Sequence, residues 1–209
     1  IDELYDGDIE VFLSEEASVF DDIREVLDQQ FARLSPAEQE VIYALAIGRE
    51  PCTIQQLTQR LMPSAAKRGV IEAVNSLRRR SLIEKVAGPE GNMQLGSGST
   101  GFTLQNVVME YVTNNLCEQI EQEIELNAPA LIVRHALLET QTKEYVRQSQ
   151  VRLLLDPIAV RLIARLGRTE ATDRCLRLIA TSRLAPTSGF SSGNVINLLL
   201  HMGFDPAHQ

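Results

Sequence analysis

The amino-acid sequence predicts a mainly helical chain, in which three helices and a β-hairpin are followed by an all-helical bundle. Three observations carry this prediction. Apolar residues recur at helical spacing, two capping boxes mark helix starts, and two short β-type runs enclose a glycine-rich tract. The length of 209 residues and the hydrophobic content of 44% fit one or two packed domains and exclude a disordered chain.

The sequence predicts two helices at the N-terminal end, a lead-in helix and a second helix that begins at a capping box. Over residues 19–34, apolar residues recur at helical spacing with acidic residues between them, which predicts an amphipathic lead-in helix with a negative outer face. Ser35 and Glu38 then form a capping box, with Pro36 at the first helical position. This second helix is expected to end near Gly48.

Two further helices precede the hairpin. Thr53 and Gln56 form another capping box that opens a short helix, which Pro63 interrupts. A longer helix is expected over residues 65–81, with apolar residues on its inner face.

The predicted hairpin consists of residues 82–86 and 102–104, with a glycine-serine tract at 91–101 between them. Three helices followed by such a hairpin is the winged-helix arrangement, in which the hairpin is the wing. The glycines of the tract do not open a helix, so they predict a wing tip and not a phosphate-binding loop.

The remainder of the chain is predicted to be all-helical. A long exit helix covers residues 107–126, and a helix of about 25 residues is expected after Pro129 up to Leu155. Asp156-Pro157 is interpreted as the start of the next helix, which ends at Gly167. The last two helices are expected at residues 169–184, capped by Thr169, and 194–202.

The formal net charge of -8 is unevenly distributed along the chain. Residues 1–31 carry eleven acidic residues and one basic residue, whereas residues 127–209 carry six acidic and ten basic residues. The overall acidic balance argues against nucleic acid as the main partner. No signal peptide or membrane span is expected, and three widely spaced cysteines suit a reducing cytoplasm.

No catalytic motif is visible in the sequence. It contains neither a phosphate loop of the G-x-x-x-x-G-K-[ST] type nor a G-x-G-x-x-G motif, and no nucleophile–base set stands out. The cysteines and histidines do not show metal-ligand spacing. We therefore expect no catalytic residues, no metal site and no autonomous enzyme.

The third helix of the predicted winged helix carries a group of basic residues that are candidates for an interdomain contact or, alternatively, for DNA binding. These residues are Lys67, Arg68, Arg78, Arg79 and Arg80. The triple arginine lies at the C-terminal end, whereas base-reading residues usually come from the N-terminal half. The segment 87–100 of the wing carries no basic residue, which also argues against DNA.

The stretches "FTLQNVVMEYVTNNLCEQI", "DQQFARLSPAEQEVIYALAIGREP" and "SLRRRSLIEK" resemble the C-terminal part of bacterial NB-ARC ATPases. These are signalling NTPases of the STAND class, often followed by WD or pentapeptide repeats. The resemblance implies a tail of a preceding helical subdomain at 1–18, a winged-helix subdomain at 19–126 and a helical linker domain at 127–209.

The resemblance also implies a nucleotide contact. In the family, a histidine after the second strand of the hairpin reaches the β-phosphate of ADP. At the matching positions this chain has Gln105 and Asn106, and a glutamine amide can donate a hydrogen bond but carries no charge. Asn106 is also a candidate cap for the helix that follows. The Walker motifs are absent from this chain, so ADP or ATP with Mg is expected only in the full-length protein.

The function implied by the resemblance is regulatory. The winged helix would close over the ADP-bound ATPase core, its partner upstream, and the helical region would couple it to a downstream repeat domain. Homo-oligomerisation on activation is implied as well. Two alternatives remain at this point: a winged-helix DNA-binding transcription regulator, and an oligomerisation or scaffold module.

Overall fold

The computed structural model describes residues 23–61, 67–87, 100–184 and 189–204. Helices account for most of these residues, which confirms the prediction of a mainly helical chain. Residues 23–32 are helical and lie within the predicted lead-in helix. The elements that follow are α2 (Pro36–Gly48), α3 (Ile54–Arg60), α4 (Lys67–Arg79), β1 (Ile83–Ala87), β2 (Thr100–Leu104), α5 (Asn106–Leu126), α6 (Leu131–Arg134), α7 (Glu144–Gln150), the π-helical turn η1 (Val151–Leu155), α8 (Asp156–Leu166), α9 (Arg168–Leu184) and α10 (Ser191–His201).

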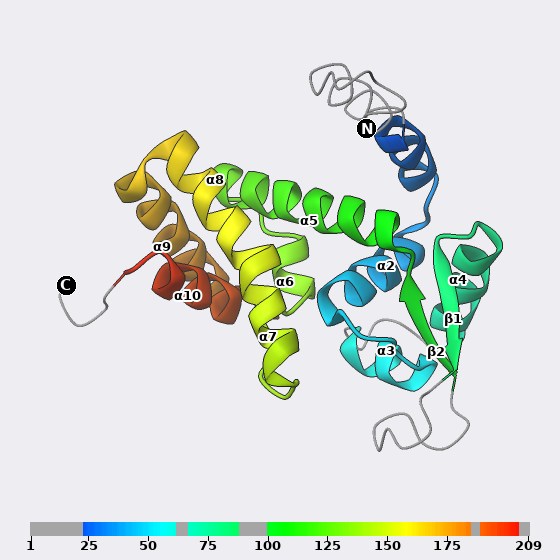
Figure 1. Cartoon of the computed structure of the whole chain (residues 1–209). Coiled ribbons are helices and arrows are strands. Elements are labelled where there is room, and N and C mark those ends of the chain that lie inside the picture. Colours follow the sequence, from blue (N-terminus) through cyan, green and yellow to red (C-terminus); the bar gives the residue numbers. More distant parts are fainter. Residues whose placement is uncertain (1–22, 62–66, 88–99, 185–188, 205–209) are drawn as a thin grey trace, which may run out of the picture.

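The elements form two groups joined by one long helix (Figure 1). Helices α2 to α4 and the two strands lie at one end and are called the N-terminal unit here. Helices α6 to α10, with η1, lie at the other end and are called the C-terminal helices. Helix α5 runs from the hairpin across to the C-terminal helices. Buried apolar residues of both groups belong to one continuous cluster, so the groups share a core.

The two predicted capping boxes are confirmed. The Ser35 hydroxyl accepts a hydrogen bond from the Glu38 amide at 3.3 Å, and the Glu38 carboxylate accepts one from the Ser35 amide at 2.7 Å. Thr53 and Gln56 form the same reciprocal pair at the start of α3. Each box satisfies amide groups that the first turn of a helix leaves without partners.

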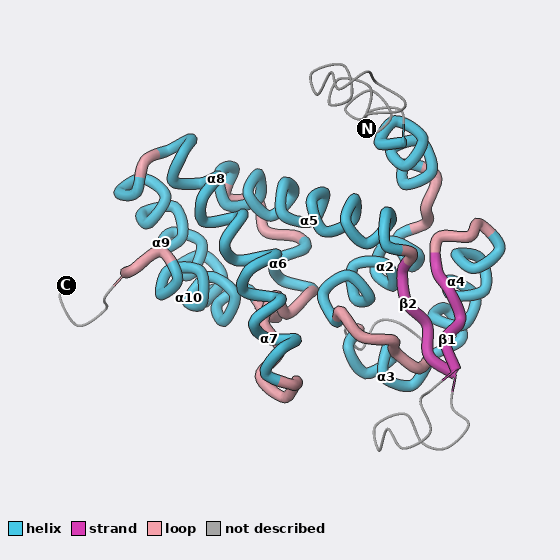
Figure 2. Tube along the Cα trace, viewed as in Figure 1, coloured by secondary structure: helices cyan, strands magenta, loops and turns pink. Residues whose placement is uncertain are grey.

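The hairpin is antiparallel, with a register that runs from Ile83 opposite Leu104 to Ala87 opposite Thr100. Figure 2 shows that the strands are confined to the end of the molecule that holds α3 and α4. Cys52 adds a bridge to this pair, because it exchanges two backbone hydrogen bonds with Phe102. Of the predicted glycine-serine tract at 91–101, residues 91–99 lie outside the described residues, as does the predicted tail at 1–18. Thr100 and Gly101 belong to β2, so the second strand begins two residues earlier than predicted.

The prediction of one helix of about 25 residues up to Leu155 is wrong. Instead, α6 ends at Arg134, and α7 begins only at Glu144. The reason is competition for backbone groups from α10 and the residue before it. The Asn194 side chain binds the backbone at Ile132, His135 and Leu137, and the Phe190 amide donates to the Val133 carbonyl, whereas Glu123 accepts the amides of residues 130–132 and caps the start of α6.

Helix α8 begins at Asp156 with Pro157 in its first turn, as predicted, but the prediction that Asp156 is an N-cap is wrong, because the helical backbone is continuous with the preceding turn. Helices α7 and α8 are continuous through η1, and Leu155 has helical dihedral angles. Pro157 has no amide hydrogen for the carbonyl of Leu153, and the π-helical turn precedes it. The Cys117 thiol lies 3.6 Å from that carbonyl oxygen and is a weak replacement donor.

The last two helices begin earlier than predicted. Helix α9 begins at Arg168, so Thr169 lies inside the first turn and is not the cap. Helix α10 begins at Ser191, three residues before the predicted start at Asn194. Helix α8 does end at Gly167, as predicted, where φ is +76°.

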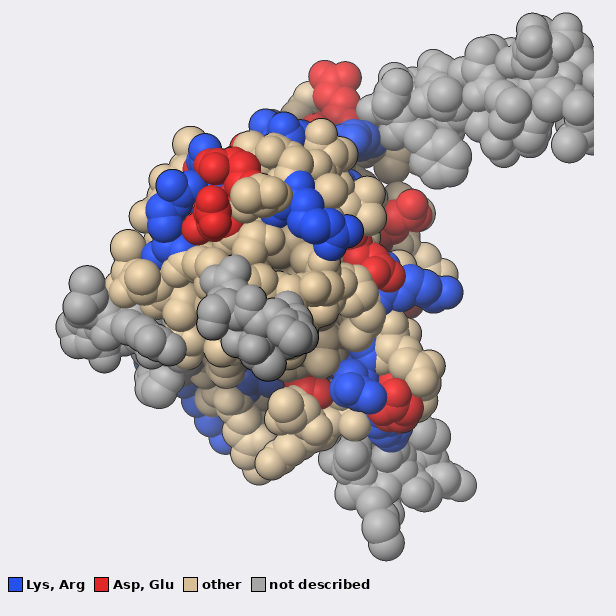
Figure 3. Space-filling view, turned by 90° about the vertical axis from the view of Figure 1, so that its left-hand side faces the viewer, with Lys and Arg blue, Asp and Glu red and all other residues tan. Residues whose placement is uncertain are grey.

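Charges of both signs share the end of the molecule formed by the C-terminal helices. In Figure 3, which faces this end, basic and acidic residues are interspersed around an area without charged residues. Residues 127–209 carry more basic than acidic residues, but on the face shown in Figure 3 they do not form one continuous positive surface. Among the described residues, no helix is long and apolar enough to span a bilayer.

Candidate functional site

The first candidate site is the N-terminus of α5. Gln105 is the N-cap residue, with an extended backbone (φ -62°, ψ 149°), and its side chain makes no capping hydrogen bond. Asn106 is the first helical residue and is exposed, so the prediction that Asn106 caps this helix is wrong. The strand pairing ends at Leu104, and the chain turns into the helix one residue earlier than predicted.

An uncapped helix start leaves its first amide groups available. The first backbone hydrogen bond of α5 runs from the Met109 amide to the Gln105 carbonyl oxygen, with a donor–acceptor distance of 2.7 Å. The amides of Asn106, Val107 and Val108 therefore have no acceptor within the helix. Together with the positive end of the helix dipole, they favour an anionic group beside Gln105. This donor set fits a phosphate.

The structure does not bring all five predicted basic residues together. Lys67 and Arg68 lie at the start of α4, whereas Arg78, Arg79 and Arg80 lie at or just past its end, about 18 Å away at 1.5 Å per residue. All five side chains are exposed. Arg68 pairs with Glu72 at 3.0 Å on the same helix.

The arginines at the end of α4 lie near the candidate nucleotide contact. The Gln105 amide is 3.5 Å from the carbonyl of Leu82, which follows Arg80 by two residues. Among the described residues, Arg78, Arg79 and Arg80 form no ion pair within 4.0 Å. The start of α5 and the basic end of α4 therefore lie close together in the N-terminal unit, and Val107 at the start of α5 also lines a hollow with Asp28 and Glu110.

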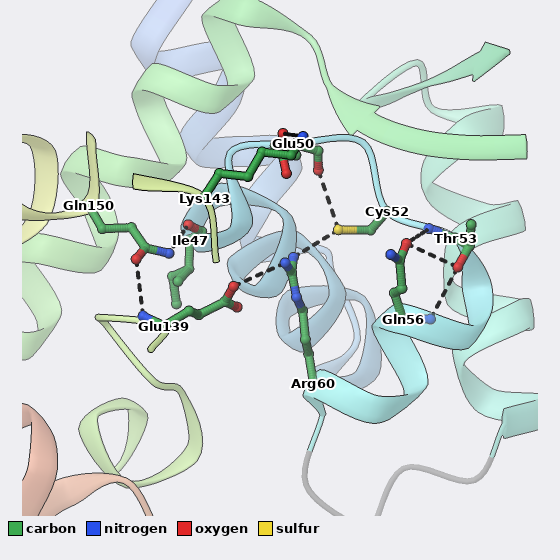
Figure 4. Close-up of polar contacts among 9 residues, drawn as sticks. All are labelled: Ile47, Glu50, Cys52, Thr53, Gln56, Arg60, Glu139, Lys143 and Gln150. Atoms are coloured by element: carbon green, nitrogen blue, oxygen red, sulfur yellow. Dashed lines mark hydrogen bonds and ion pairs between the residues drawn. The ribbon is translucent and has the colours of Figure 1, made fainter. Parts of the chain in front are cut away.

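A second candidate site, which the sequence did not indicate, joins the N-terminal unit to the C-terminal helices (Figure 4). Arg60, the last residue of α3, donates to the Cys52 sulfur at 2.8 Å and to the Glu139 carboxylate at 3.0 Å. Glu139 belongs to the connection between α6 and α7. We call this set of contacts, with those of Gln150 and Glu50 below, the polar junction.

Gln150 is the most buried member of the polar junction. Its side chain has no exposed area; it donates to the Ile47 carbonyl at 2.9 Å and accepts from the Glu139 amide at 3.0 Å. Gln150 lies between Val146 and Leu154 at four-residue spacing, and all three residues are buried. A polar residue in an otherwise apolar helical stripe is the one sequence signal that could have indicated this junction.

Burial shifts the pKa values of two groups in the junction. Burial raises the pKa of the Cys52 thiol to about 11, despite the nearby Arg60 guanidinium, so the sulfur is protonated at neutral pH and is not a nucleophile. Burial also raises the pKa of Glu139, against the opposing effect of Arg60. The arrangement serves to fix two groups of helices relative to each other.

We expect the junction to weaken in acid through Glu50. Burial opposes its ionisation, but hydrogen bonds from Lys143 (2.7 Å) and Tyr145 prevail and hold the pKa of Glu50 below its ordinary value. The stabilisation is complete above the unfolded pKa of about 4.3 and is lost as pH falls through the lower folded pKa. Urea unfolding of Glu50→Gln between about pH 7 and about pH 3 should show a smaller loss of stability than the parent chain.

The control for this measurement is Gln55→Ala, an exposed substitution on α3 that removes no titrating group. It should keep the pH dependence of the parent chain. An equally steep loss of stability in Glu50→Gln would contradict the role assigned to the Glu50 carboxylate.

Comparisons with known proteins give one informative match. No protein-family model matches the chain, and no solved structure matches it. The chain is similar to a protein of Nostoc sp. described as an uncharacterized WD repeat-containing protein, with 39% identity over an alignment of 245 residues. The alignment covers 98% of this chain and 18% of that relative. The chain therefore spans less than a fifth of a longer, repeat-containing relative.

Proposed function

We propose that this chain is the regulatory, non-catalytic part of a STAND-type signalling NTPase of the NB-ARC kind. In this proposal the N-terminal unit is a winged-helix subdomain, and the edge formed by the start of α5 and the end of α4 closes over an ADP-bound ATPase core to hold the inactive state. The observation that carries the proposal is the uncapped start of α5 at Gln105, near the exposed arginines at the end of α4, of which Arg80 also donates to the Arg33 carbonyl. Anionic phosphate oxygens are the groups that uncapped helix-start amides and arginine side chains favour.

The C-terminal helices would couple this subdomain to a downstream repeat domain. Two features support the coupling. Helix α5 runs without interruption from the hairpin into the C-terminal helices, and the polar junction ties α2 and α3 to the segment before α7. A movement of the N-terminal unit would therefore carry the C-terminal helices with it. The repeat-containing relative is consistent with a downstream sensor of this type.

The remaining parts of the proposal rest on the resemblance to NB-ARC ATPases. ADP or ATP with Mg would bind the full-length protein, with Gln105 and the first amides of α5 facing the phosphates and Arg78, Arg79 and Arg80 contacting the core. The protein would be cytoplasmic and would oligomerise when the core is released. A regulatory switch of this kind requires two packings that differ in their nucleotide contacts.

The test is ADP retention by the full-length protein. Gln105→Ala removes a side-chain donor next to a phosphate, so ADP should dissociate about tenfold faster, as expected for a lost hydrogen bond to a charged group. Gln122→Ala is a matched control, since it removes the same side chain from an exposed position on α5. Equal ADP dissociation rates in both variants and the parent protein would remove Gln105 from the nucleotide site.

A further inference from the structure

Arg49 is a half-buried arginine whose charge no neighbouring carboxylate balances. It is the C-cap residue of α2, and its guanidinium donates from Nη2 to the Thr113 hydroxyl of α5 at 2.8 Å. Its Nε atom is buried and has no hydrogen-bond partner. Within the described part of the chain, no carboxylate lies within 4.0 Å of this guanidinium, and it donates to none of the carbonyls that end α2. A cation withdrawn from water without a counter-charge is costly, so these surroundings favour an anion.

The Cys117 thiol, one helical turn beyond Thr113 on α5, does not supply that anion. Burial raises the pKa of this thiol to about 11, although the Arg161 and Arg49 guanidiniums act in the opposite direction. The thiol is therefore neutral near neutral pH. Burial also lowers the pKa of Arg49, but an arginine side chain stays protonated in proteins, so its positive charge persists.

Arg161 brings a second guanidinium to the same part of the molecule. It comes from α8 and lies close enough to Cys117 to influence the thiol, as Arg49 does. Its Nη1 atom is buried without a hydrogen-bond partner among the described residues, and its ion pair with Glu118 is long, at 3.7 Å. The remainder of the side chain reaches the surface, since 34% of it is exposed.

The acidic residues near the thiol are engaged by other arginines as well. Glu118 lies 3.4 Å from Arg24 in addition to 3.7 Å from Arg161, so one carboxylate is shared by two cations. Glu121 pairs with Arg165 at 2.9 Å. These carboxylates therefore leave positive charge at this part of α5 that they do not balance.

We propose that Arg49 and Arg161, beside Thr113 of α5, form a binding site for a small phosphate-type oxyanion, which we call the Arg49 site. Guanidinium groups present paired N–H donors that match the oxygen atoms of phosphate. Both side chains are partly exposed, so an anion from solvent can reach them. An oxyanion held by both links the end of α2 to α8, and so links the N-terminal unit to the C-terminal helices.

The Arg49 site is distinct from the start of α5. Thr113 lies about 10 Å beyond Asn106 along the helix, at 1.5 Å per residue. The proposal therefore does not depend on the nucleotide contact at Gln105.

The test is thermal unfolding of the 209-residue chain in phosphate and in chloride at equal ionic strength. About 10 mM phosphate should raise the unfolding midpoint by about 3 °C over chloride, as expected for a ligand present at several times its Kd. Arg49→Met removes the guanidinium but keeps an unbranched apolar side chain, and it should abolish this rise. In phosphate-free buffer, Arg49→Met should unfold at or above the midpoint of the parent chain, since an unbalanced charge is removed.

Arg147→Met is the matched control, because Arg147 is exposed on α7 and pairs with Glu144 of the same helix. It should keep the full effect of phosphate. A phosphate titration followed by amide NMR resonances locates the site. The amides of Thr113 and Cys117 should shift in the parent chain and in the control, and they should stay unchanged in Arg49→Met.

Three results would overturn the proposal. An equal rise of the midpoint in the parent chain and in Arg49→Met would show only the general effect of phosphate on protein stability. Unchanged amides at Thr113 and Cys117 throughout the titration would place any bound phosphate elsewhere. An Arg49→Met variant that unfolds well below the parent chain in phosphate-free buffer would show that the guanidinium is balanced without a ligand.

Discussion

Replacing Glu123 with alanine is expected to lower the free energy of unfolding by about 4 kcal/mol, because three hydrogen bonds to a charged group are lost together. The carboxylate near the end of α5 accepts the amides of Ala130, Leu131 and Ile132 at 2.9, 2.7 and 3.1 Å. Only 9% of its surface is exposed, so water cannot readily replace it. Urea unfolding monitored by circular dichroism measures the loss.

The matched control for Glu123→Ala is Gln122→Ala, the neighbouring exposed position on α5. Because Gln122 has no hydrogen-bond partner among the described residues, its substitution should change the free energy of unfolding by less than about 0.5 kcal/mol. A Glu123→Ala variant as stable as the control would contradict the idea that this carboxylate organises the chain after α5.

Asn194→Ala is expected to cost about 3 kcal/mol of stability, since it leaves three buried backbone groups without partners. The Asn194 side chain donates to the carbonyls of Ile132 and His135 at 2.8 and 2.7 Å and accepts the amide of Leu137 at 2.9 Å. These bonds hold the non-helical connection after α6 against α10. Loss of protection from hydrogen exchange at Leu137 should accompany the lower stability.

Asn197 provides a control of the same residue type on the same helix. Its side chain makes no hydrogen bond within the described part of the chain, so Asn197→Ala should leave stability within about 0.5 kcal/mol of the parent chain. Equal effects of the two asparagine substitutions would show that the contacts of Asn194 do not hold this connection.

The elements that could be predicted from the sequence are those whose signals are local. The capping boxes at Ser35 and Thr53 lie within four residues of the groups they satisfy, and the stops at Gly48 and Gly167 need only their immediate neighbours. These elements occur where predicted. Hydrophobic periodicity likewise located the long helix α5.

The errors concern segments whose structure is decided at a distance. The connection between α6 and α7 has helical periodicity, but Asn194, at least 57 residues along the chain, binds its backbone groups instead. Nothing in residues 130–155 alone signals this competition. Pro157 lies in the first turn of α8, as predicted, but the chain is already helical before it, through a π-helical turn in which the Leu153 carbonyl lies 3.6 Å from the Cys117 thiol.

The two candidate sites also differ in whether a local sequence signal pointed to them. Gln105 and Asn106 could be singled out because a family resemblance points to the residues after the second strand, and the structure then places Gln105 at an uncapped helix start. The ion pair of the polar junction could not be predicted, since Arg60 and Glu139 are 79 residues apart and show no shared pattern; only Gln150, a polar residue in an apolar helical stripe, gave a signal for the junction. Only the fold brings Arg60 and Glu139 within 3.0 Å of each other.

The most direct test of the proposed function is hydrogen exchange of the full-length protein with and without bound ADP. The amides of Asn106, Val107 and Val108 have no acceptor within α5, so they should exchange fast in the nucleotide-free protein. We expect ADP to slow exchange at these three amides while the amides in the middle of α9 stay unchanged. Unaltered exchange at residues 106–108 in a protein that demonstrably holds ADP would contradict the account.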